Sequence, residues 1–129
     1  MAIDSSAFIA VLLGEPEQTA FIDAITAERT RLASAATVLE TSMVLLSRKG
    51  EAGLAEFRAF HARAAVQTAG FGPEHVDLAL DAFRRFGKGR HRAGLNFGDC
   101  LSYALARATG EPLLFKGEDF ALTDVKRAR

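Results

Sequence analysis

The sequence lacks the usual means of stapling a fold or anchoring it in a membrane. It has one cysteine, three prolines and no tryptophan among its 129 residues. A lone cysteine excludes an internal disulfide, and no apolar run approaches the roughly 18 residues that a spanning helix needs. The start of the chain does not resemble a signal peptide either. We therefore expect one cytoplasmic domain over residues 1–129, with no membrane contact, stabilised by a single core.

An excess of charge of one sign is also absent. Sixteen Lys and Arg residues balance sixteen Asp and Glu residues, so the formal net charge is zero. Proteins that bind nucleic acid through overall charge are usually basic, so a nucleic-acid partner has to be inferred here from local patches. The hydrophobic fraction of 49% is typical of a globular protein.

Short apolar runs alternate with longer segments of helical period, which predicts an α/β fold. We expect short strands at residues 2–4, 31–33, 66–68 and 112–115, with a last edge strand near 125. We expect helices from residue 5 or 6 to 14, from 16, from 37 to 50, from 51, from 73 to 87 and from 97 to 110. Helical crossovers between these strands would give a short-stranded parallel sheet covered on both faces, a three-layer α/β/α arrangement.

Local patterns at the helix ends suggest how several polar residues are used. Ser5 or Ser6 is predicted to cap the first helix, and Thr37 with Glu40 has the spacing of a capping box. The phenylalanines, Phe97 among them, recur at helical spacing, so we expect them to be mostly core.

Acidic residues stand close behind the predicted strands. Asp4 closes the first strand, Glu40 follows the second, Asp99 lies in the first turn of a late helix, and Glu118 and Asp119 follow the fourth strand. Ligands of parallel sheets bind beyond the carboxyl ends of the strands, so these side chains are expected to converge. Gathered carboxylates repel one another unless a cation neutralises them, which favours a hard ion such as Mg²⁺.

Each of these acids also has a purely structural interpretation. Asp4 can cap a helix, Glu40 can complete a capping box, Asp99 can offset a helix dipole, and Glu118 and Asp119 can belong to a turn. These interpretations leave unexplained why Asp99 stands in an otherwise apolar stretch. Spacing alone keeps both interpretations open.

A basic loop precedes Asp99. In GKGRHRAGLNFGDC, which covers residues 87–100, Lys88, Arg90 and Arg92 lie on a segment broken by glycines. An isolated loop of this kind is usually solvated surface. Beside an acidic site that must admit a polyanion, the cations would bind phosphates, and Lys116 is a second candidate at the same rim.

Other nucleophiles are less well supported. Cys100 has no histidine placed as its base, so we expect it to be a small buried residue. The serines at positions 5 and 6 lack a G-x-S-x-G elbow. Phosphatases with an aspartyl nucleophile need a second aspartate two residues after the first, where this chain has Ser6.

Four stretches together resemble the PIN-domain ribonucleases, specifically the VapC-type toxins of bacterial toxin–antitoxin pairs. They are DSSAF from residue 4, TVLE from 37, LNFGDC from 95 and LLFKGEDF from 113. The resemblance extends over essentially the whole chain and implies the PIN fold.

The resemblance also assigns roles. Asp4 and Asp99 match the aspartates that hold an essential Mg²⁺ (or Mn²⁺), Glu40 matches the glutamate that completes the acidic triad, and Ser6 matches a hydroxyl residue that supports the first aspartate. The fourth acidic position falls at Glu118 or Asp119, and the pattern leaves both open.

The function implied is that of a Mg²⁺-dependent endoribonuclease that cleaves phosphodiesters with metal-activated water. The family further implies a homodimer and inhibition by a VapB-type antitoxin, whose tail lies in a groove near the site. The alternative is a non-catalytic RNA-binding or scaffolding module that keeps the fold. Its carboxylates would then have no chemical role, and degenerate nucleases tend to lose them.

Overall fold

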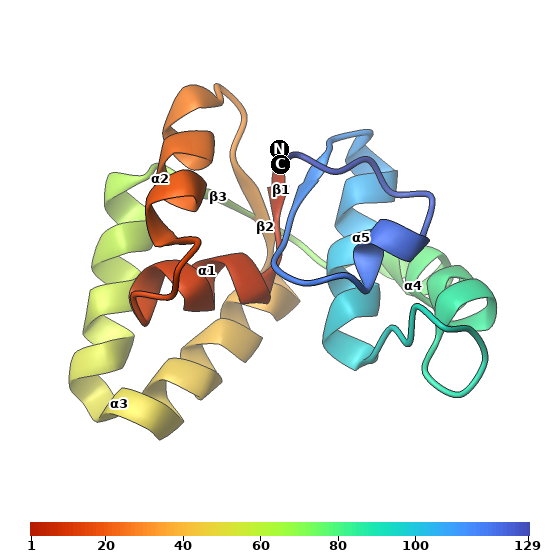
Figure 1. Cartoon of the computed structure of the whole chain (residues 1–129), viewed down its shortest axis with the longest axis horizontal. Coiled ribbons are helices and arrows are strands. Elements are labelled where there is room, and N and C mark those ends of the chain that lie inside the picture. The colour runs from red at the N-terminus through yellow and green to blue at the C-terminus, as the bar shows by residue number, and fades with distance from the viewer.

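The computed structural model describes residues 1–129 and has the expected three-layer α/β architecture (Figure 1). Its strands are β1 (Ala2–Ile3), β2 (Leu32–Ser34), β3 (Gln67–Ala69) and β4 (Leu113–Leu114). Its helices are α1 (Ser5–Leu12), α2 (Gln18–Ala27), α3 (Ala35–Arg63), α4 (Pro73–Phe86) and α5 (Phe97–Thr109), with a 3₁₀ turn at Phe120–Leu122. The predicted strands are confirmed to within about two residues, except for the one near residue 125.

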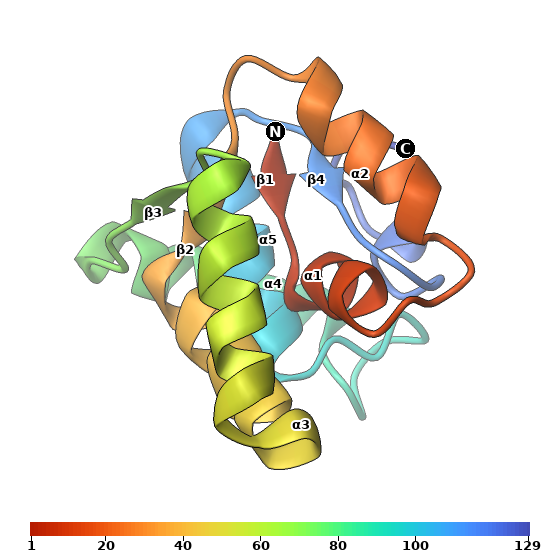
Figure 2. The ribbon, with the colours of Figure 1, turned by 90° about the vertical axis from the view of Figure 1, so that its left-hand side faces the viewer.

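The four strands form one parallel sheet in the order β3-β2-β1-β4. Ala2 of β1 is opposite Leu32 on one side and Leu113 on the other. All four strands therefore run the same way, and their carboxyl ends share one edge. Helices α1, α2 and α3 cover one face of the sheet and α4 and α5 cover the other, as Figures 1 and 2 show from two sides.

The sheet divides the core into two apolar clusters. Ile3 and Leu114 belong to the cluster under α1–α3, whereas their strand neighbours Ala2 and Leu113 belong to the cluster under α4 and α5. Alternation of this kind is what the pleat of a strand imposes. Because both faces of the sheet are covered, the two-residue strands β1 and β4 are apolar at both positions.

The observed helix starts correct two of the predicted caps. Helix α1 begins at Ser5, and its N-cap is Asp4, which accepts from the Ser6 backbone N–H. Helix α3 begins at Ala35 with Ser34 as its cap. The predicted capping box at Thr37 and Glu40 is therefore wrong, because the helix is capped three residues earlier and both residues lie inside it.

The break predicted near residue 50 is confirmed. The helices expected on either side of it are the two segments of α3, which is kinked at Gly50, whose φ of 66° is left-handed and suits glycine. No strand forms near Val125; instead Arg127 makes an isolated parallel bridge to Leu113. None of the helices combines the length and apolarity required to traverse a lipid bilayer.

Three hydrogen-bonded residues, Arg85, Tyr103 and Asp124, form a polar clasp that attaches the segment after the 3₁₀ turn to α4 and α5. The Tyr103 hydroxyl donates to Asp124 (2.8 Å), and Arg85 donates both to Asp124 (3.0 Å) and to the Tyr103 oxygen (3.2 Å). Burial would raise the pKa of Asp124, but the hydrogen bonds from Tyr103 and Arg85 outweigh it and lower that pKa. The segment after the 3₁₀ turn is thus attached to the helical layer by charge-assisted bonds.

The aromatic cluster around Phe8 predicts where the fold is most sensitive. Phe8 has no exposed surface, and its ring centroid is 5.2 Å from that of Phe57 in an edge-on arrangement. Phe8→Ala should lower the free energy of unfolding by about 3–5 kcal/mol, because it removes the ring and leaves a cavity. Urea unfolding followed by circular dichroism measures this loss. Ile22→Ala, on the partly exposed surface of α2, is the control and should cost less than about 1 kcal/mol; equal losses would contradict the assignment of Phe8 to the core.

Candidate active site

The first carboxylate, Asp4, is buried at the end of β1, with 2% of its surface exposed. Ser6 donates to its Oδ2 from the backbone N–H (3.0 Å) and from the hydroxyl (2.5 Å). Ser102 donates from its hydroxyl to the other oxygen, Oδ1 (2.5 Å). A buried charge is tolerated when it is hydrogen-bonded in this way, so both Asp4 oxygens keep fixed positions.

Ser102 was not predicted from the sequence. This residue lies on α5 with 1% of its surface exposed, and its hydroxyl oxygen is 3.3 Å from the Thr37 hydroxyl oxygen of α3. The hydroxyls of Ser6 on α1 and Ser102 on α5 thus both bond Asp4, and Thr37 contacts the second of them. The available signal was a serine inside the otherwise apolar run from Cys100 to Ala106, which needs a polar partner when buried.

Asp99 lies in the first turn of α5 and forms the capping box of that helix. Its Oδ2 accepts from the Asn96 N–H (3.0 Å), and its own N–H donates to Asn96 Oδ1 (2.9 Å). Burial raises the pKa of Asp99 to about 6; the Asn96 bond opposes this, and the charges of Asp4, Asp119 and Glu40 add to it. Asp99 therefore lies within the electrostatic field of three other acids from separate parts of the chain.

Glu40 reaches the same place from α3. Burial raises its pKa, the Ser5 side chain opposes the shift, and the charge of Asp4 adds to it. Its Oε1 is buried and has no hydrogen-bond partner. A buried acceptor without a donor is costly, so this oxygen is a position where a cation or a proton donor would be stabilised.

The fourth acidic position lies on the exposed segment after β4. Both Glu118 and Asp119 are exposed, but only Asp119 contributes to the raised pKa of Asp99. The next residue, Phe120, is buried and packs against Phe115 with ring centroids 5.1 Å apart, which fixes the segment. Of the two candidates, Asp119 is the one whose charge acts on Asp99.

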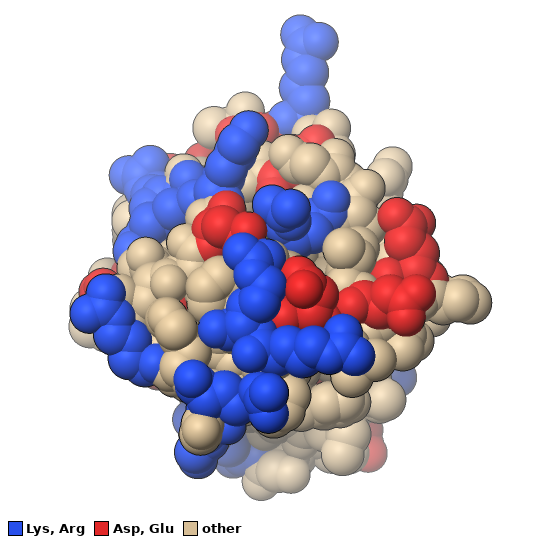
Figure 3. Space-filling view, turned by 90° about the vertical axis from the view of Figure 1, so that its right-hand side faces the viewer, with Lys and Arg blue, Asp and Glu red and all other residues tan.

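Lys88, Arg90 and Arg92 are all exposed on the loop between α4 and α5. Arg90 donates to the Arg84 carbonyl (3.3 Å), and its guanidinium lies 5.8 Å from the centre of the Phe83 ring. Figure 3, which views the side of α4 and α5, shows that Lys and Arg side chains gather on this face around smaller groups of acidic ones. A chain of zero net charge therefore carries a locally cationic face.

Lys116 is placed differently from the loop cations. Its backbone N–H donates to the Ser6 hydroxyl oxygen (3.0 Å), so this residue does border the site. Its ammonium pairs with Glu15 (3.2 Å) and Glu17 (3.3 Å) at the start of the second helical segment. The charge of Lys116 is already engaged by two carboxylates and would have to leave them to reach a phosphate.

Two further residues near the site, Cys100 and Phe97, were both expected to be buried, and only the first of them is. Cys100 is buried as expected, and burial, with the charge of Asp99, raises the pKa of its thiol to about 11, which disfavours the nucleophilic thiolate. Phe97 was expected in the core, but 81% of its surface is exposed at the start of α5. Phe97 does belong to the apolar stripe that the helical period predicts, but at the N-terminal end of α5 this stripe faces outward.

The acidic side chains suit a hard divalent cation that keeps several waters better than a metal ion whose ligands all come from the protein. No three His, Cys, Asp or Glu side chains are arranged closely enough to hold one ion between them. Mg²⁺ does not need such a cage, since it takes one or two carboxylates and fills its octahedron with water and phosphate oxygens. Asp4 and Asp99 could offer these carboxylates, and the unpartnered Oε1 of Glu40 could be a further acceptor beside them.

Comparison with known proteins assigns the chain to a family. The model of the PIN domain matches residues 1–126. Ribonuclease VapC30 of Mycobacterium tuberculosis is 50% identical over 125 residues, covering 97% of this chain and 95% of the relative. Ribonuclease VapC of Mycolicibacterium smegmatis is also 50% identical, covering 97% of both chains.

A solved structure agrees on the fold. The crystal structure of M. tuberculosis VapC20, described as a sarcin–ricin loop cleaving toxin, superimposes with a TM-score of 0.77 at 17% identity and covers 96% of this chain and 95% of VapC20. With an acidic edge on a parallel α/β sheet, and relatives of this identity along nearly the whole length, the chain belongs to the PIN-domain family, among its VapC ribonucleases.

Proposed function

We propose that this chain is a Mg²⁺-dependent endoribonuclease and the toxin of a toxin–antitoxin pair. The observation that carries the proposal is the convergence of Asp4, Glu40, Asp99 and Asp119 at the carboxyl edge of the sheet, where their charges act on one another. The names of its relatives, ribonucleases of the VapC type, support the same activity. Capping of α1 accounts for one of the three donors to Asp4, but a scaffolding module would have no use for the charges of Glu40 and Asp99 beside it.

The mechanism divides the work among the carboxylates. Asp4 and Asp99 would hold the cation, which when bound acidifies water and stabilises charge on the phosphate. Ser6 and Ser102 keep the Asp4 oxygens in place, so that Asp4 is pre-organised before the ion arrives. The free Oε1 of Glu40 can accept a proton at the site.

The first test removes the carboxyl charge without changing side-chain size. Asp4→Asn and Asp99→Asn should each lower the rate of RNA cleavage by at least about 100-fold, because the cation loses a charged ligand. EDTA should abolish cleavage by the wild type, and added Mg²⁺ or Mn²⁺ should restore it. Gel analysis of a labelled structured RNA measures these rates.

Asp23→Asn, on the exposed surface of α2, is the matched control and should cleave at the wild-type rate. Cleavage that survives both substitutions would contradict the metal site. RNA binding without any cleavage in Mg²⁺ would instead support the non-catalytic module.

We further propose that the loop cations Lys88, Arg90 and Arg92 bind the RNA backbone. Arg90→Ala combined with Arg92→Ala should weaken RNA binding and reduce the slope of log affinity against log salt by about 0.7 for each phosphate that the variant no longer binds. Fluorescence anisotropy across a salt series measures both quantities. Arg58→Ala with Arg63→Ala, two exposed cations of α3, is the control; if both pairs behave alike, the loop has no special role.

The proposed partners follow from the same family. A VapB-type antitoxin would inhibit the enzyme by placing its tail near the site and presenting a basic residue to the carboxylates. Such a residue would neutralise the same acidic cluster that otherwise takes the cation. Since the RNA substrate and the antitoxin would both be cytoplasmic, we place this chain in the cytoplasm.

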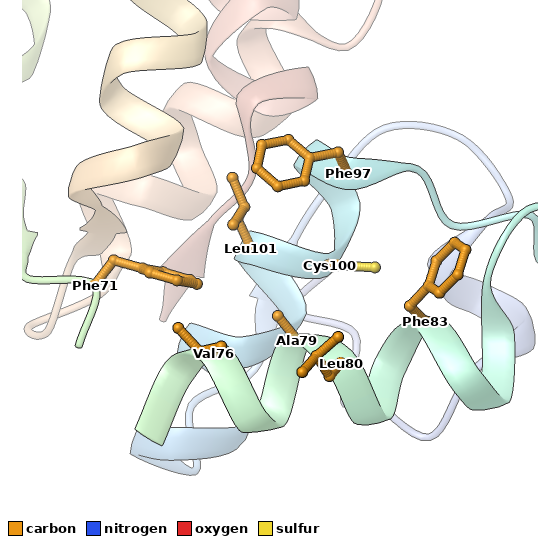
Figure 4. Close-up of a pocket in the computed structure, with 8 residues that line it drawn as sticks. All are labelled: Phe71, Val76, Ala79, Leu80, Phe83, Phe97, Cys100 and Leu101. Atoms are coloured by element: carbon orange, nitrogen blue, oxygen red, sulfur yellow. The ribbon is translucent and has the colours of Figure 1, made fainter. Parts of the chain in front are cut away.

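A homodimer is proposed on the apolar face made by α3, α4 and α5. Exposed apolar side chains there are Leu39, Met43, Val76, Leu80, Phe83 and Phe97. Figure 4 shows the groove between α4 and α5, with Phe71 and Phe83 toward its two ends and Phe97 on its α5 side. A second groove, against α3, shares Phe71, Phe97 and Leu101 with the first.

A face that carries both a protruding aromatic ring and apolar grooves can receive the same ring from a second copy across a two-fold axis. Such self-complementarity is what an isologous dimer requires. Exposed apolar patches of this kind are also uncommon on monomers unless they have a partner. Both properties of this face favour a second copy of the chain as the occupant.

The dimer is tested by placing a charge in the groove. Leu80→Asp should raise the dimer dissociation constant by at least about 30-fold, as expected for an anchor residue at the centre of an interface. Sedimentation velocity over a concentration series measures it. Ile22→Asp on α2, with a similar exposed fraction, should leave the dimer intact; a wild type that is monomeric at tens of micromolar would contradict the proposal.

A further inference from the structure

Gly98, the second residue of α5, has no room for a side chain. A Cβ atom built on it would lie 2.1 Å from Oε2, 2.7 Å from Cδ and 2.8 Å from Oε1 of Glu40. Real Cβ atoms essentially never come within 3.0 Å of such neighbours. The three nearest obstructing atoms all belong to one carboxylate group, the one that α3 brings to the acidic site.

The backbone itself does not require glycine at this position. Six of the eleven glycines have a left-handed φ, but Gly98 is helical and is not among them. Within a helix, glycine is less favourable than alanine by up to about 1 kcal/mol. The reason for glycine at 98 therefore lies in its contact with Glu40.

The other obstructed glycines differ from Gly98 in what obstructs them. At Gly53 a Cβ would meet a backbone carbonyl as well as the Lys49 side chain, and at Gly87 it would meet the carbonyl and ring of Phe83. Those two glycines allow segments of main chain to pack closely. Gly98 instead makes room for the end of a flexible acidic side chain, which a structural glycine has no need to do.

We propose that Gly98 is a positioning residue: the absence of its side chain lets the Glu40 carboxylate lie against the first turn of α5, beside Asp99. This inference rests on the proposed function and deepens it. A larger side chain at 98 would move the carboxylate of Glu40 away from the site. Because the displaced atoms are at the end of a flexible side chain, the fold itself would be retained.

The neighbouring turn of α5 supports this role. Ser102 lies four residues after Gly98, on the same side of the helix, and its hydroxyl bonds Asp4. One side of α5 thus contacts two carboxylates that come from other elements, and Asp99, next to Gly98, supplies the third. The acidic triad therefore meets at the N-terminal part of this helix.

The test is a double-mutant cycle with Gly98→Ala, Glu40→Ala and the two combined. Gly98→Ala should keep the wild-type melting temperature to within a few degrees. It should lower both Mn²⁺ affinity and the kcat/KM of RNA cleavage about 10- to 100-fold, as the loss of a supporting residue does at metal sites. The combined variant should be no worse than Glu40→Ala alone, because both changes act through one carboxylate.

Gly70→Ala is the matched control, since Gly70 is exposed and a Cβ there would meet nothing within 4 Å. The proposal is overturned if Gly98→Ala binds Mn²⁺ as the wild type does, if the two effects multiply in the combined variant, or if Gly98→Ala unfolds the protein with and without Glu40. Mn²⁺ affinity decides this point separately from catalysis: a wild type that binds Mn²⁺ but cleaves no RNA would overturn the nuclease proposal alone.

Discussion

Mutual repulsion among carboxylates at one edge of the sheet is the constraint on which the rest of this structure depends. Asp4 is buried, and burial of Asp99 together with the charges of Asp4, Asp119 and Glu40 raises the pKa of Asp99 to about 6. Such a cluster disfavours folding unless donors or cations compensate it. The chain supplies donors for Asp4 and Asp99 and leaves an oxygen of Glu40 free.

The helical layers are arranged around that compensation. Hydroxyls reach Asp4 both from the helix that follows it and from α5 on the opposite face of the sheet, so the first carboxylate is held from two layers. Helix α5 connects the cationic loop to the acidic edge, because it begins where the loop ends and carries Asp99 in its first turn. A polyanion bound close to these carboxylates would be favoured by this combination, since the cations would offset its repulsion by the carboxylates.

The sequence predicted the elements and the acids better than it predicted their contacts. Asp4 was identifiable because an acid directly after an apolar run in a parallel sheet lies at the carboxyl edge. Glu40 was also expected near this edge, but its alternative role in a capping box with Thr37 is wrong, because α3 begins at Ala35 with Ser34 as its cap. The true box, Asn96 with Asp99, has an aspartate in the place usually taken by Glu or Gln.

What the sequence could not indicate depends on tertiary packing. Ser102 and Gly98 matter because α5 lies against Asp4 and Glu40. Ser102 is separated from Asp4 by 98 positions along the chain, and Gly98 is separated from Glu40 by 58. Phe97 follows the helical period of α5 but lies at its outer end, so periodicity alone assigned it to the core. Contacts between elements that are distant in sequence leave no periodic signal in either element.

The clasp of Arg85, Tyr103 and Asp124 has a consequence for the dynamics of the site. The segment that carries Asp119 is held at one end by the bond from Lys116 to Ser6 and at the other by Asp124 on the helical layer. A loop pinned at both ends cannot open by fraying; it opens only when one of its anchors is released. Movement of Asp119 away from the other carboxylates therefore requires loss of the Lys116–Ser6 bond at α1 or of the bonds from Tyr103 and Arg85 to Asp124.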